Sequence, residues 1–223
     1  MNYESPIVTV DVPLFTLLDR RLHVALGVRE KAPEMGKACV TGGYIHTDED
    51  VDDQAAALRI LREKVDFVPR YAEQGFTEAN RNRDERGWSV SIVWLALADA
   101  ESLVDLVARR GMKLYDIQDG GANLPEQMAF DHRLLVLKAA ERLRSKAAYS
   151  TIVAHMLPRE FSMSELQGAY EAVRLKPCNA ANFRTKILKE QVLAETDMLR
   201  SGGRPATGYT LKEPIAYFDR ELY

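Results

Sequence analysis

Residues 42 to 67 contain the pattern that most restricts the fold of this 223-residue chain. Two glycines, Gly42 and Gly43, precede an acidic stretch from Asp48 to Asp53. Apolar residues then recur at helical spacing and predict a helix from Asp52 to Lys64. The residues that carry this spacing are Ala55, Leu58, Leu61 and Val65.

Strand patterns lie on both sides of this helix. Residues Ile7 to Leu17 alternate β-branched and apolar side chains, and Leu22 to Val28 repeat the signal. After the helix, Tyr71 to Phe76 and Trp88 to Leu97 are further strand candidates around a polar loop, Asn80 to Gly87. Strands, one helix and strands again predict an α+β sandwich.

The composition indicates a soluble protein of the reduced cytoplasm. The chain is 46% hydrophobic and 28% charged, as in ordinary globular proteins. It has no run of about 18 apolar residues, so we expect no membrane span, and it has no secretory signal pattern. The two cysteines, Cys39 and Cys178, lie far apart in the sequence, which favours free thiols. The four histidines lack paired spacing and predict no metal site.

The C-terminal part has the pattern of a winged helix-turn-helix. Ser162 to Glu165 is a capping box that opens a helix at residues 166–173. Pro177 breaks the chain, and Cys178 or Asn179 caps a second helix that we expect to reach about Val192. Short strand candidates at residues 193–199 and 207–211 flank a glycine-rich tip, Gly202-Gly203-Arg204.

A loop at residues 116–125 and a long helix that Asp131 can N-cap precede this part. We therefore predict two domains, residues 1–149, with a linker helix from about residue 131, and residues 150–223. The net charge of −3 argues against a generic nucleic-acid coat. Between Arg174 and Arg204, however, Lys and Arg outnumber Asp and Glu by 7 to 3, and local charge matters more than total charge for docking on phosphates.

The glycine and helix pattern resembles a Nudix box, G-x5-E-x7-R-E-U-x-E-E-x-G-U with U aliphatic. Gly43 and Glu49 keep the first spacing, but nine residues rather than seven precede Arg59. The three metal-binding glutamates of the family helix correspond here to Ile60, Glu63 and Lys64, so two of the three carboxylates are missing.

This loss removes the chemistry that the resemblance implies. A Nudix enzyme holds Mg²⁺ against a pyrophosphate, and Mg²⁺ requires several carboxylate and water oxygens. Ile60 offers no oxygen, and the Lys64 ammonium repels a cation. We expect a pocket without catalytic residues, metal or other cofactor. An alternative is that Glu49 and Glu63 rebuild a metal site with Asp48 or Asp52.

The whole chain resembles the Nudix-related transcriptional regulators. The similarity rests on the order of several short stretches, which are RDERGWSVS at residues 83–91, MAFDH at 128–132, MLPREF at 156–161, NFR at 182–184 and RPA at 204–206. The resemblance implies an α+β fold, a Nudix-like α/β/α sandwich followed by a winged helix. It also implies a regulator that responds to ADP-ribose, or in some relatives to a sugar.

Two sets of site residues follow. The effector-binding candidates surround the degenerate box and the loop after it: Gly43, Arg59, Glu63, Lys64, Arg83 and Arg86. Lys64 places an ammonium near where Mg²⁺ would neutralise a pyrophosphate, which allows binding without turnover. The loop around Arg83 and Arg86 is equally compatible with a plain hairpin tip or a dimer contact.

The second helix of the C-terminal part mixes amide, hydroxyl and basic groups, as a recognition helix requires. The DNA-binding candidates are Asn182, Arg184, Thr185, Lys186, Lys189 and, at the wing tip, Arg204. The sequence thus predicts a cytoplasmic, homodimeric repressor that reads a palindromic operator and senses a phosphate-bearing effector such as ADP-ribose. The alternative is an active Nudix pyrophosphohydrolase with an accessory winged domain.

Overall fold

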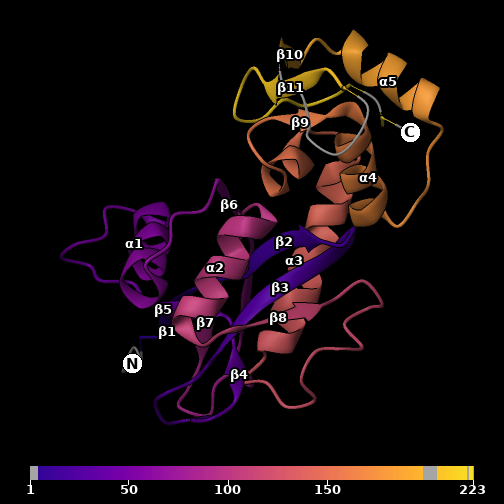
Figure 1. Ribbon diagram of the computed structural model, residues 1–223. Coiled ribbons are helices and arrows are strands. Elements are labelled where there is room, and N and C mark those ends of the chain that lie inside the picture. Colours follow the sequence, from indigo (N-terminus) through magenta and orange to yellow (C-terminus); the bar gives the residue numbers. More distant parts are fainter. Residues whose placement is uncertain (1–4, 198–204, 220, 223) are drawn as a thin grey trace.

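Strands β1 to β8 form one mixed sheet in the N-terminal half of the computed structural model, which describes residues 5–197, 205–219, 221 and 222. Figure 1 shows this sheet in the lower lobe and a smaller lobe above it. The strands are β1 (Ile7–Val12), β2 (Leu14–Leu18), β3 (Arg21–Val28), β4 (Ala38–Cys39), β5 (Thr41–Tyr44), β6 (Tyr71–Asn80), β7 (Ser89–Leu97) and β8 (Lys113–Asp116).

The long strand predicted over residues 7–17 is divided into two by Pro13. Proline has no N–H to donate to a sheet, and here only its carbonyl takes part, accepting from Ala96 N at 3.1 Å. Both pieces run parallel to β7, first β1 and then β2. Beyond them the sheet forks, because β5 pairs with β1 whereas β3 pairs with β2. Strand β6 covers the other edge of β7.

Helices cover both faces of the sheet, as the predicted sandwich requires. On β7, Trp94 and Ala96 pack in one hydrophobic cluster with helices α1 (Asp53–Val65) and α2 (Ala100–Arg110). The alternate residues Leu95 and Leu97 pack in a second cluster with α3 (His132–Ala147). This is the two-residue period of a strand buried on both faces.

Helix α2 is an element that the sequence patterns above do not include. Its ends nevertheless carry local signals, since Asp99 caps it by accepting from Ser102 N at 3.0 Å and Gly111 ends it with a left-handed φ of 62°. Only Leu103 and Leu106 are buried, so the apolar stripe is narrow.

The predicted N-cap of α3 is corrected in one respect. Asp131 occupies the N-cap position but makes no side-chain bond to the helix backbone. Its carboxylate instead accepts two hydrogen bonds from Arg83, at 3.0 Å each. A charged partner outcompetes a neutral backbone N–H for the same oxygens.

The smaller lobe has the helix, helix and hairpin order predicted for a winged helix. It contains the 3₁₀ helix η1 (Ile152–Met156), β9 (Phe161–Ser162), α4 (Met163–Arg174), α5 (Ala180–Lys189), β10 (Leu193–Thr196) and β11 (Gly208–Leu211). The capping box of Ser162 and Glu165 is present, and Asn179 caps α5. Helix α5 ends at Lys189, three residues before the predicted Val192. The chain leaves the helix because Gln191 has a φ of +56°.

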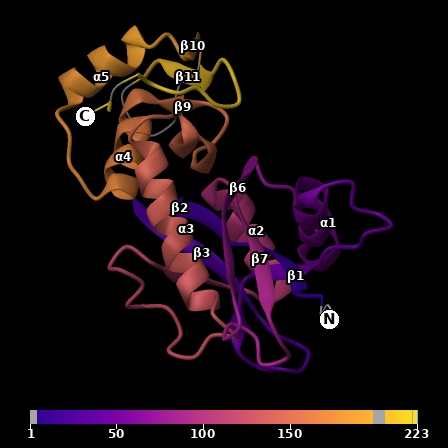
Figure 2. The same ribbon diagram turned by 180° about the vertical axis from the view of Figure 1, so that it is seen from behind.

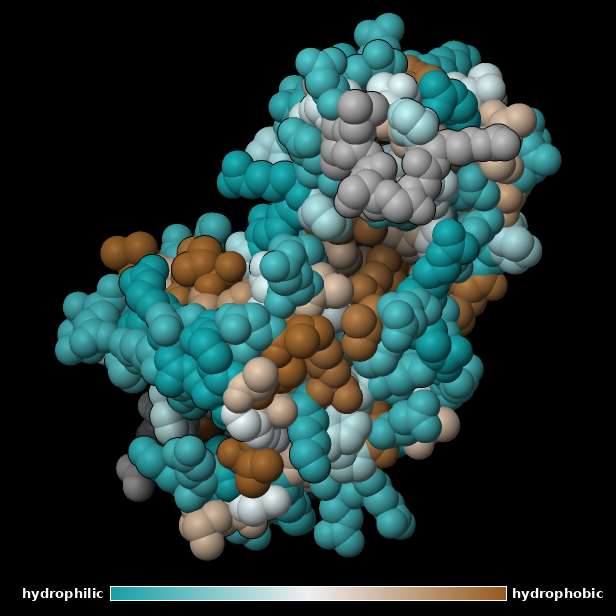
Figure 3. Space-filling view, in the orientation of Figure 1, coloured by the Kyte–Doolittle hydropathy of each residue, from teal (hydrophilic) through white to brown (hydrophobic). Residues whose placement is uncertain are grey.

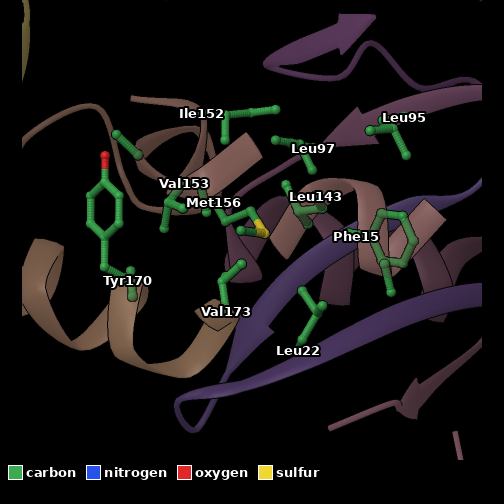
Figure 4. Packing of buried hydrophobic residues seen from close by; sticks show 14 of the residues in the cluster. Phe15, Leu22, Leu95, Leu97, Leu143, Ile152, Val153, Met156, Tyr170 and Val173 are labelled. Atoms are coloured by element: carbon green, nitrogen blue, oxygen red, sulfur yellow. The ribbon is translucent and has the colours of Figure 1, made fainter. Parts of the chain in front are cut away.

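A single hydrophobic cluster continues from the sheet into the smaller lobe. Figure 4 shows Phe15 and Leu97 of the sheet, Leu143 of α3 and Tyr170 of α4 in this cluster. The end of the chain also returns to the linker, where Phe218 N donates to Tyr149 O at 2.7 Å. The division at residue 150 remains a prediction, because the core runs through it.

In the part of the chain that the structure describes, no helix is long and apolar enough to cross a membrane. Figure 3 shows hydrophilic side chains over most of one face, with hydrophobic residues gathered at the waist between the two lobes.

Candidate functional site

Two adjacent glycines allow β5 to approach its neighbours closely. A Cβ on Gly42 would collide with the Asp11 carboxylate and would lie 3.0 Å from Val10 O. A Cβ on Gly43 would lie 3.3 Å from Ile60 Cγ1 and 3.4 Å from Lys64 Nζ. The glycine pair therefore lets α1 lie against the strand, which brings the remnants of the box to β5.

Both substituted metal positions have new structural roles. Ile60 is 1% exposed and belongs to the core between α1 and the sheet. Lys64 extends over β5, where its ammonium donates to the carbonyl of Gly42. Burial lowers the pKa of Lys64, and the Asp11 carboxylate opposes this effect. The Lys64 ammonium therefore lies beside Gly42 and Gly43.

Arg59 fastens the acidic loop to α1. Its guanidinium donates to both Asp50 oxygens at 2.8 Å, to Tyr44 O at 2.9 Å and to Glu63 at 3.1 Å. These bonds to Arg59 hold the pKa of Asp50 at about 2. Most of the Arg59 donors are therefore engaged within the protein, and Glu63 is engaged with them.

The acids considered for a rebuilt metal site also have local partners. The Glu49 carboxylate accepts from His46 Nδ1 at 3.1 Å, and Asp52 caps α1 by accepting from Ala55 N at 2.7 Å. Among the described residues, no three His, Cys, Asp or Glu side chains gather as a metal-binding group.

Arg83 is a buried structural cation. Its side chain is 5% exposed and bridges Asp131 and Ser89, with the Asp11 carboxylate 3.8 Å away. His132 lies beside the same carboxylate, 3.7 Å from it, and burial lowers the pKa of this histidine. A guanidinium enclosed in this way faces protein partners rather than solvent.

Arg86 lies on the surface between two aromatic rings. It donates to both Asp84 oxygens, at 2.9 and 2.6 Å, and to Tyr44 OH at 2.6 Å. Its guanidinium is 5.9 Å from the Tyr44 ring centre and 5.7 Å from that of Phe130. Arg29 lies 4.7 Å from the same Phe130 ring. Tyr44, Phe130 and Arg29 were not among the sequence candidates.

Three of the six effector candidates therefore lie around β5, in a set of residues that we call the β5 patch: Gly43, Lys64 and Arg86, together with Arg29, Tyr44 and Phe130. Arg59 and Glu63 adjoin it through the carbonyl of Tyr44. Arg83 lies beneath it in the core. Cations beside aromatic rings suit a ligand with phosphates and a planar base.

Helix α5 presents its polar residues to solvent. Phe183 and Ile187 are buried, which fixes the orientation of the helix. The predicted DNA-binding residues of this helix are all exposed: Asn182, Arg184, Thr185, Lys186 and Lys189. Leu188 is 37% exposed.

The local contacts separate these residues into two groups. Arg184 is braced against the sheet, since it donates to Tyr209 OH at 3.2 Å, and Thr185 donates to Ala181 O at 2.9 Å. Lys186 and Lys189 make no ion pair with any described residue. The remaining candidate, Arg204, lies outside the described residues, as do Gly202 and Gly203.

Comparisons with known proteins find a family model for the smaller lobe and a relative of most of the chain. The family model described as the NrtR DNA-binding winged helix domain matches residues 153–211. The ADPR responsive transcriptional repressor NtrR of Acinetobacter baylyi is 30% identical over 209 residues, which cover 93% of this chain and 83% of the repressor.

Solved structures extend the similarity to the whole fold. The crystal structure of Shewanella oneidensis NrtR complexed with a 27mer DNA is 35% identical, with a TM-score of 0.87 over 97% of this chain and 99% of that one. The Nudix domain of the same protein, crystallised with ADP ribose, is 33% identical, with a TM-score of 0.54 over 63% of this chain and 90% of the domain. The repressor NtrR matches this chain over most of the length of both proteins. Together with the degenerate Nudix domain and the winged helix, this similarity places the chain in the NrtR family of transcriptional regulators.

Proposed function

We propose that this chain is a transcriptional repressor that binds operator DNA through its winged helix and responds to ADP-ribose bound at the β5 patch. The observation that carries this proposal is the similarity over 97% of the chain to an NrtR structure that contains DNA. The protein acts on the chromosome and thus in the cytoplasm.

The geometry of α5 supports the DNA-binding half. A helix held by Phe183 and Ile187 cannot rotate, so it offers a constant polar face. Asn182 and Arg184, in its first half, can reach base edges, whereas Lys186 and Lys189 supply charge for phosphates. For Arg204, which lies outside the described residues, we propose entry into the minor groove.

The β5 patch supports the effector half. Lys64 and Arg86 supply positive charge for a pyrophosphate, and Tyr44 and Phe130 supply rings for stacking. Gly43 lets Lys64 lie close to β5, because a Cβ at this position would be 3.4 Å from the Lys64 Nζ atom. Arg59, Glu63 and Arg83 act indirectly, because their contacts hold the loop and the helix start on which this surface depends.

The same geometry supports the absence of hydrolysis. Restoring a carboxylate at position 60 would place it inside the core, since Ile60 is 1% exposed. Lys64 cannot ligate Mg²⁺ while it is protonated, and it does not generate hydroxide as a bound metal does. We propose that ADP-ribose is bound and not cleaved.

A homodimer completes the proposal. One winged module contacts too few bases to select a single operator in a genome. Two modules related by a two-fold axis would read two halves of a palindrome, one helical turn or a multiple apart. Sedimentation of the free protein and of its DNA complex measures this directly.

The experiment that tests the proposal starts with selection of genomic fragments by the purified full-length protein. The selected fragment is titrated by fluorescence anisotropy with and without ADP-ribose, and free ADP-ribose is followed for cleavage with Mg²⁺. We expect sequence-selective binding, a change of at least about fivefold in operator affinity with ADP-ribose, and no turnover.

Two outcomes would overturn it. Turnover at about 1 s⁻¹ or faster would make the chain a pyrophosphohydrolase. Equal affinity for selected and random fragments would remove the repressor function. The matched control is Lys113→Ala with Arg142→Ala, two exposed cations outside both sites, which should leave operator affinity unchanged.

A further inference from the structure

A cavity of about 300 Å³ lies at the junction of the two lobes, away from the β5 patch and from the exposed face of α5. Its lining combines Arg70, in the loop before β6, with residues of η1, β9 and the chain around the end of β11, among them His155, Arg159, Phe161, Lys212 and Glu213. Neither the degenerate box nor the recognition helix accounts for this cavity.

Three permanent cations converge on the cavity without an ion pair. Arg70, Arg159 and Lys212 form no salt bridge with any described residue, and neither does Glu213, the acid of the lining. Arg70 donates to the carbonyl of Leu157, which turns its guanidinium toward η1. Burial lowers the pKa of Arg70, the charge of the Asp99 carboxylate opposes this effect, and the charge of Arg159 adds to it. Like charges held together repel, and a bound anion would relieve that repulsion.

His155, which lines the cavity, is fixed by two contacts. The ring of His155 stacks on Tyr71 at 4.6 Å between centroids, with 15° between the planes. The same histidine bonds through Nε2 to the carbonyl of Pro214. This contact ties η1 to the segment after β11, so the basic residues project from a fixed frame rather than from a loose loop.

The size of the cavity restricts the ligand. A volume of about 300 Å³ is at the lower end of the range for small-molecule sites, so a compact anion fits better than a dinucleotide. Two guanidiniums and one ammonium suit phosphate oxygens, since arginine can bind two oxygens at once. Apolar walls from Ala154, Phe161 and Leu211 leave space for a short carbon chain.

DNA is a poorer match for this cavity. Helix α5 lies on the far side of the smaller lobe from β6 in both views (Figures 1 and 2), whereas Arg70 immediately precedes β6. A duplex bound by α5 would therefore lie away from the junction.

We propose that this cavity is a second ligand site, which binds a small phosphorylated metabolite through Arg70, Arg159 and Lys212. Because its lining comes from both lobes, an occupied site favours one relative position of the sheet and the winged helix. If the chain is the repressor proposed above, occupancy therefore changes operator affinity. The binding itself does not depend on that function.

The test uses inorganic pyrophosphate as the probe in isothermal titrations of the full-length protein, with saturating ADP-ribose present so that the β5 patch is already occupied. We expect one pyrophosphate per chain at this site. The double variant Arg159→Gln with Lys212→Gln, which we call the cavity variant, should weaken pyrophosphate binding by about tenfold or more, because charge-assisted contacts are lost. Both residues are exposed and without an ion pair, so the fold should survive, and thermal unfolding checks this. Arg159→Lys with Lys212→Arg keeps the charge and should retain most of the affinity.

Three further variants locate the binding. Lys64→Ala removes a cation from the β5 patch, Lys186→Gln with Lys189→Gln does so on α5, and Lys113→Gln with Arg142→Gln is the matched control for charge. All three should keep the cavity site. Loss of binding in any of them to the extent seen in the cavity variant, or no saturable binding at millimolar pyrophosphate, would overturn the proposal. If the cavity variant instead lowers the affinity for DNA of every sequence and leaves pyrophosphate binding unchanged, the three cations contact DNA and the proposal is wrong.

Discussion

The arginines of the β5 region and the cations of α5 look alike in sequence but differ in how they are paired. Arg59, Arg83 and Arg86 each donate to a carboxylate within the protein. Lys186 and Lys189 have no such partner among the described residues. Most of the positive charge around β5 is therefore neutralised within the protein, so that a ligand there contacts Lys64 or shares Arg86 with Asp84. The charge of Lys186 and Lys189 on α5 is available to a ligand without such competition.

The difference has a physical origin. A buried cation such as Arg83 would lower the stability of the fold if it had no partner, and pairing with a carboxylate removes that penalty. On an exposed helix the cost is small, because water solvates the charge. Unpaired cations persist there, and a polyanion can replace the water.

The largest expected effect is that of Arg83→Ala, which tests whether an arginine near β5 is needed for stability. It leaves the Asp131 carboxylate, and Asp11 near it, without their cation in a buried setting. We expect a loss of about 3–5 kcal/mol in the free energy of unfolding, measured by urea titration. Arg81→Ala, at an exposed neighbour in the same loop, is the control and should change it by less than about 0.5 kcal/mol. A loss below about 1 kcal/mol for Arg83→Ala would show that Arg83 is not a structural bridge.

Local sequence signals predicted the C-terminal lobe well. The capping box of Ser162 and the Asn179 cap act over three residues, so a reader of the sequence sees both partners together. In the N-terminal half, the longer strands and α1 were recovered because their periods of alternation are local, whereas α2 and the short strands β4, β5 and β8 were not predicted. Pro13 was the visible sign of the divided strand, and the pattern around it concealed the break.

The role of each site residue was harder to predict, because the deciding partner is distant in the chain. Arg83 lies 48 residues from Asp131, and Tyr44 lies 42 residues from Arg86. Neither spacing is a motif. The aromatic character of Tyr44 and Phe130 was visible, but their meeting at Arg86 depends on how β5, the loop before β7 and the start of α3 assemble.

A second prediction concerns Lys64, which contacts β5 and makes no ion pair with any residue that the structure describes. Lys64→Ala should weaken the binding of ADP-ribose by about tenfold or more, since a charge-assisted contact contributes about 1.5–3 kcal/mol. Calorimetry of the full-length protein measures it, with Lys113→Ala as the control. Unchanged affinity would move the effector away from the β5 patch.

The two groups on α5 should differ in their effect on DNA. Asn182→Ala and Arg184→Ala should each cost about 1–3 kcal/mol on the operator and relax sequence preference. Lys186→Ala and Lys189→Ala should weaken all sequences alike and reduce the salt slope by about one unit for each lost phosphate contact. Anisotropy titrations at several salt concentrations separate these effects. Full operator affinity in Asn182→Ala with Arg184→Ala would mean that α5 is not the reading helix.

The smallest expected effect tests the pairing of Arg59 by pH. Arg59 lowers the pKa of Asp50 from 3.8 to about 2, so the folded protein favours the ionised carboxylate more than the unfolded chain does. The stability from this pair is therefore complete above about pH 4 and disappears as the pH falls toward 2. Because the pair lies near the surface, solvent screening keeps the contribution modest. Urea titrations should show that Asp50→Asn is less stable than the parent at pH 5 and that the difference shrinks by pH 2.5. A difference that stays constant over this range would mean that the ionised pair does not hold the acidic loop to α1, and that the loop is fixed by its neutral contacts alone.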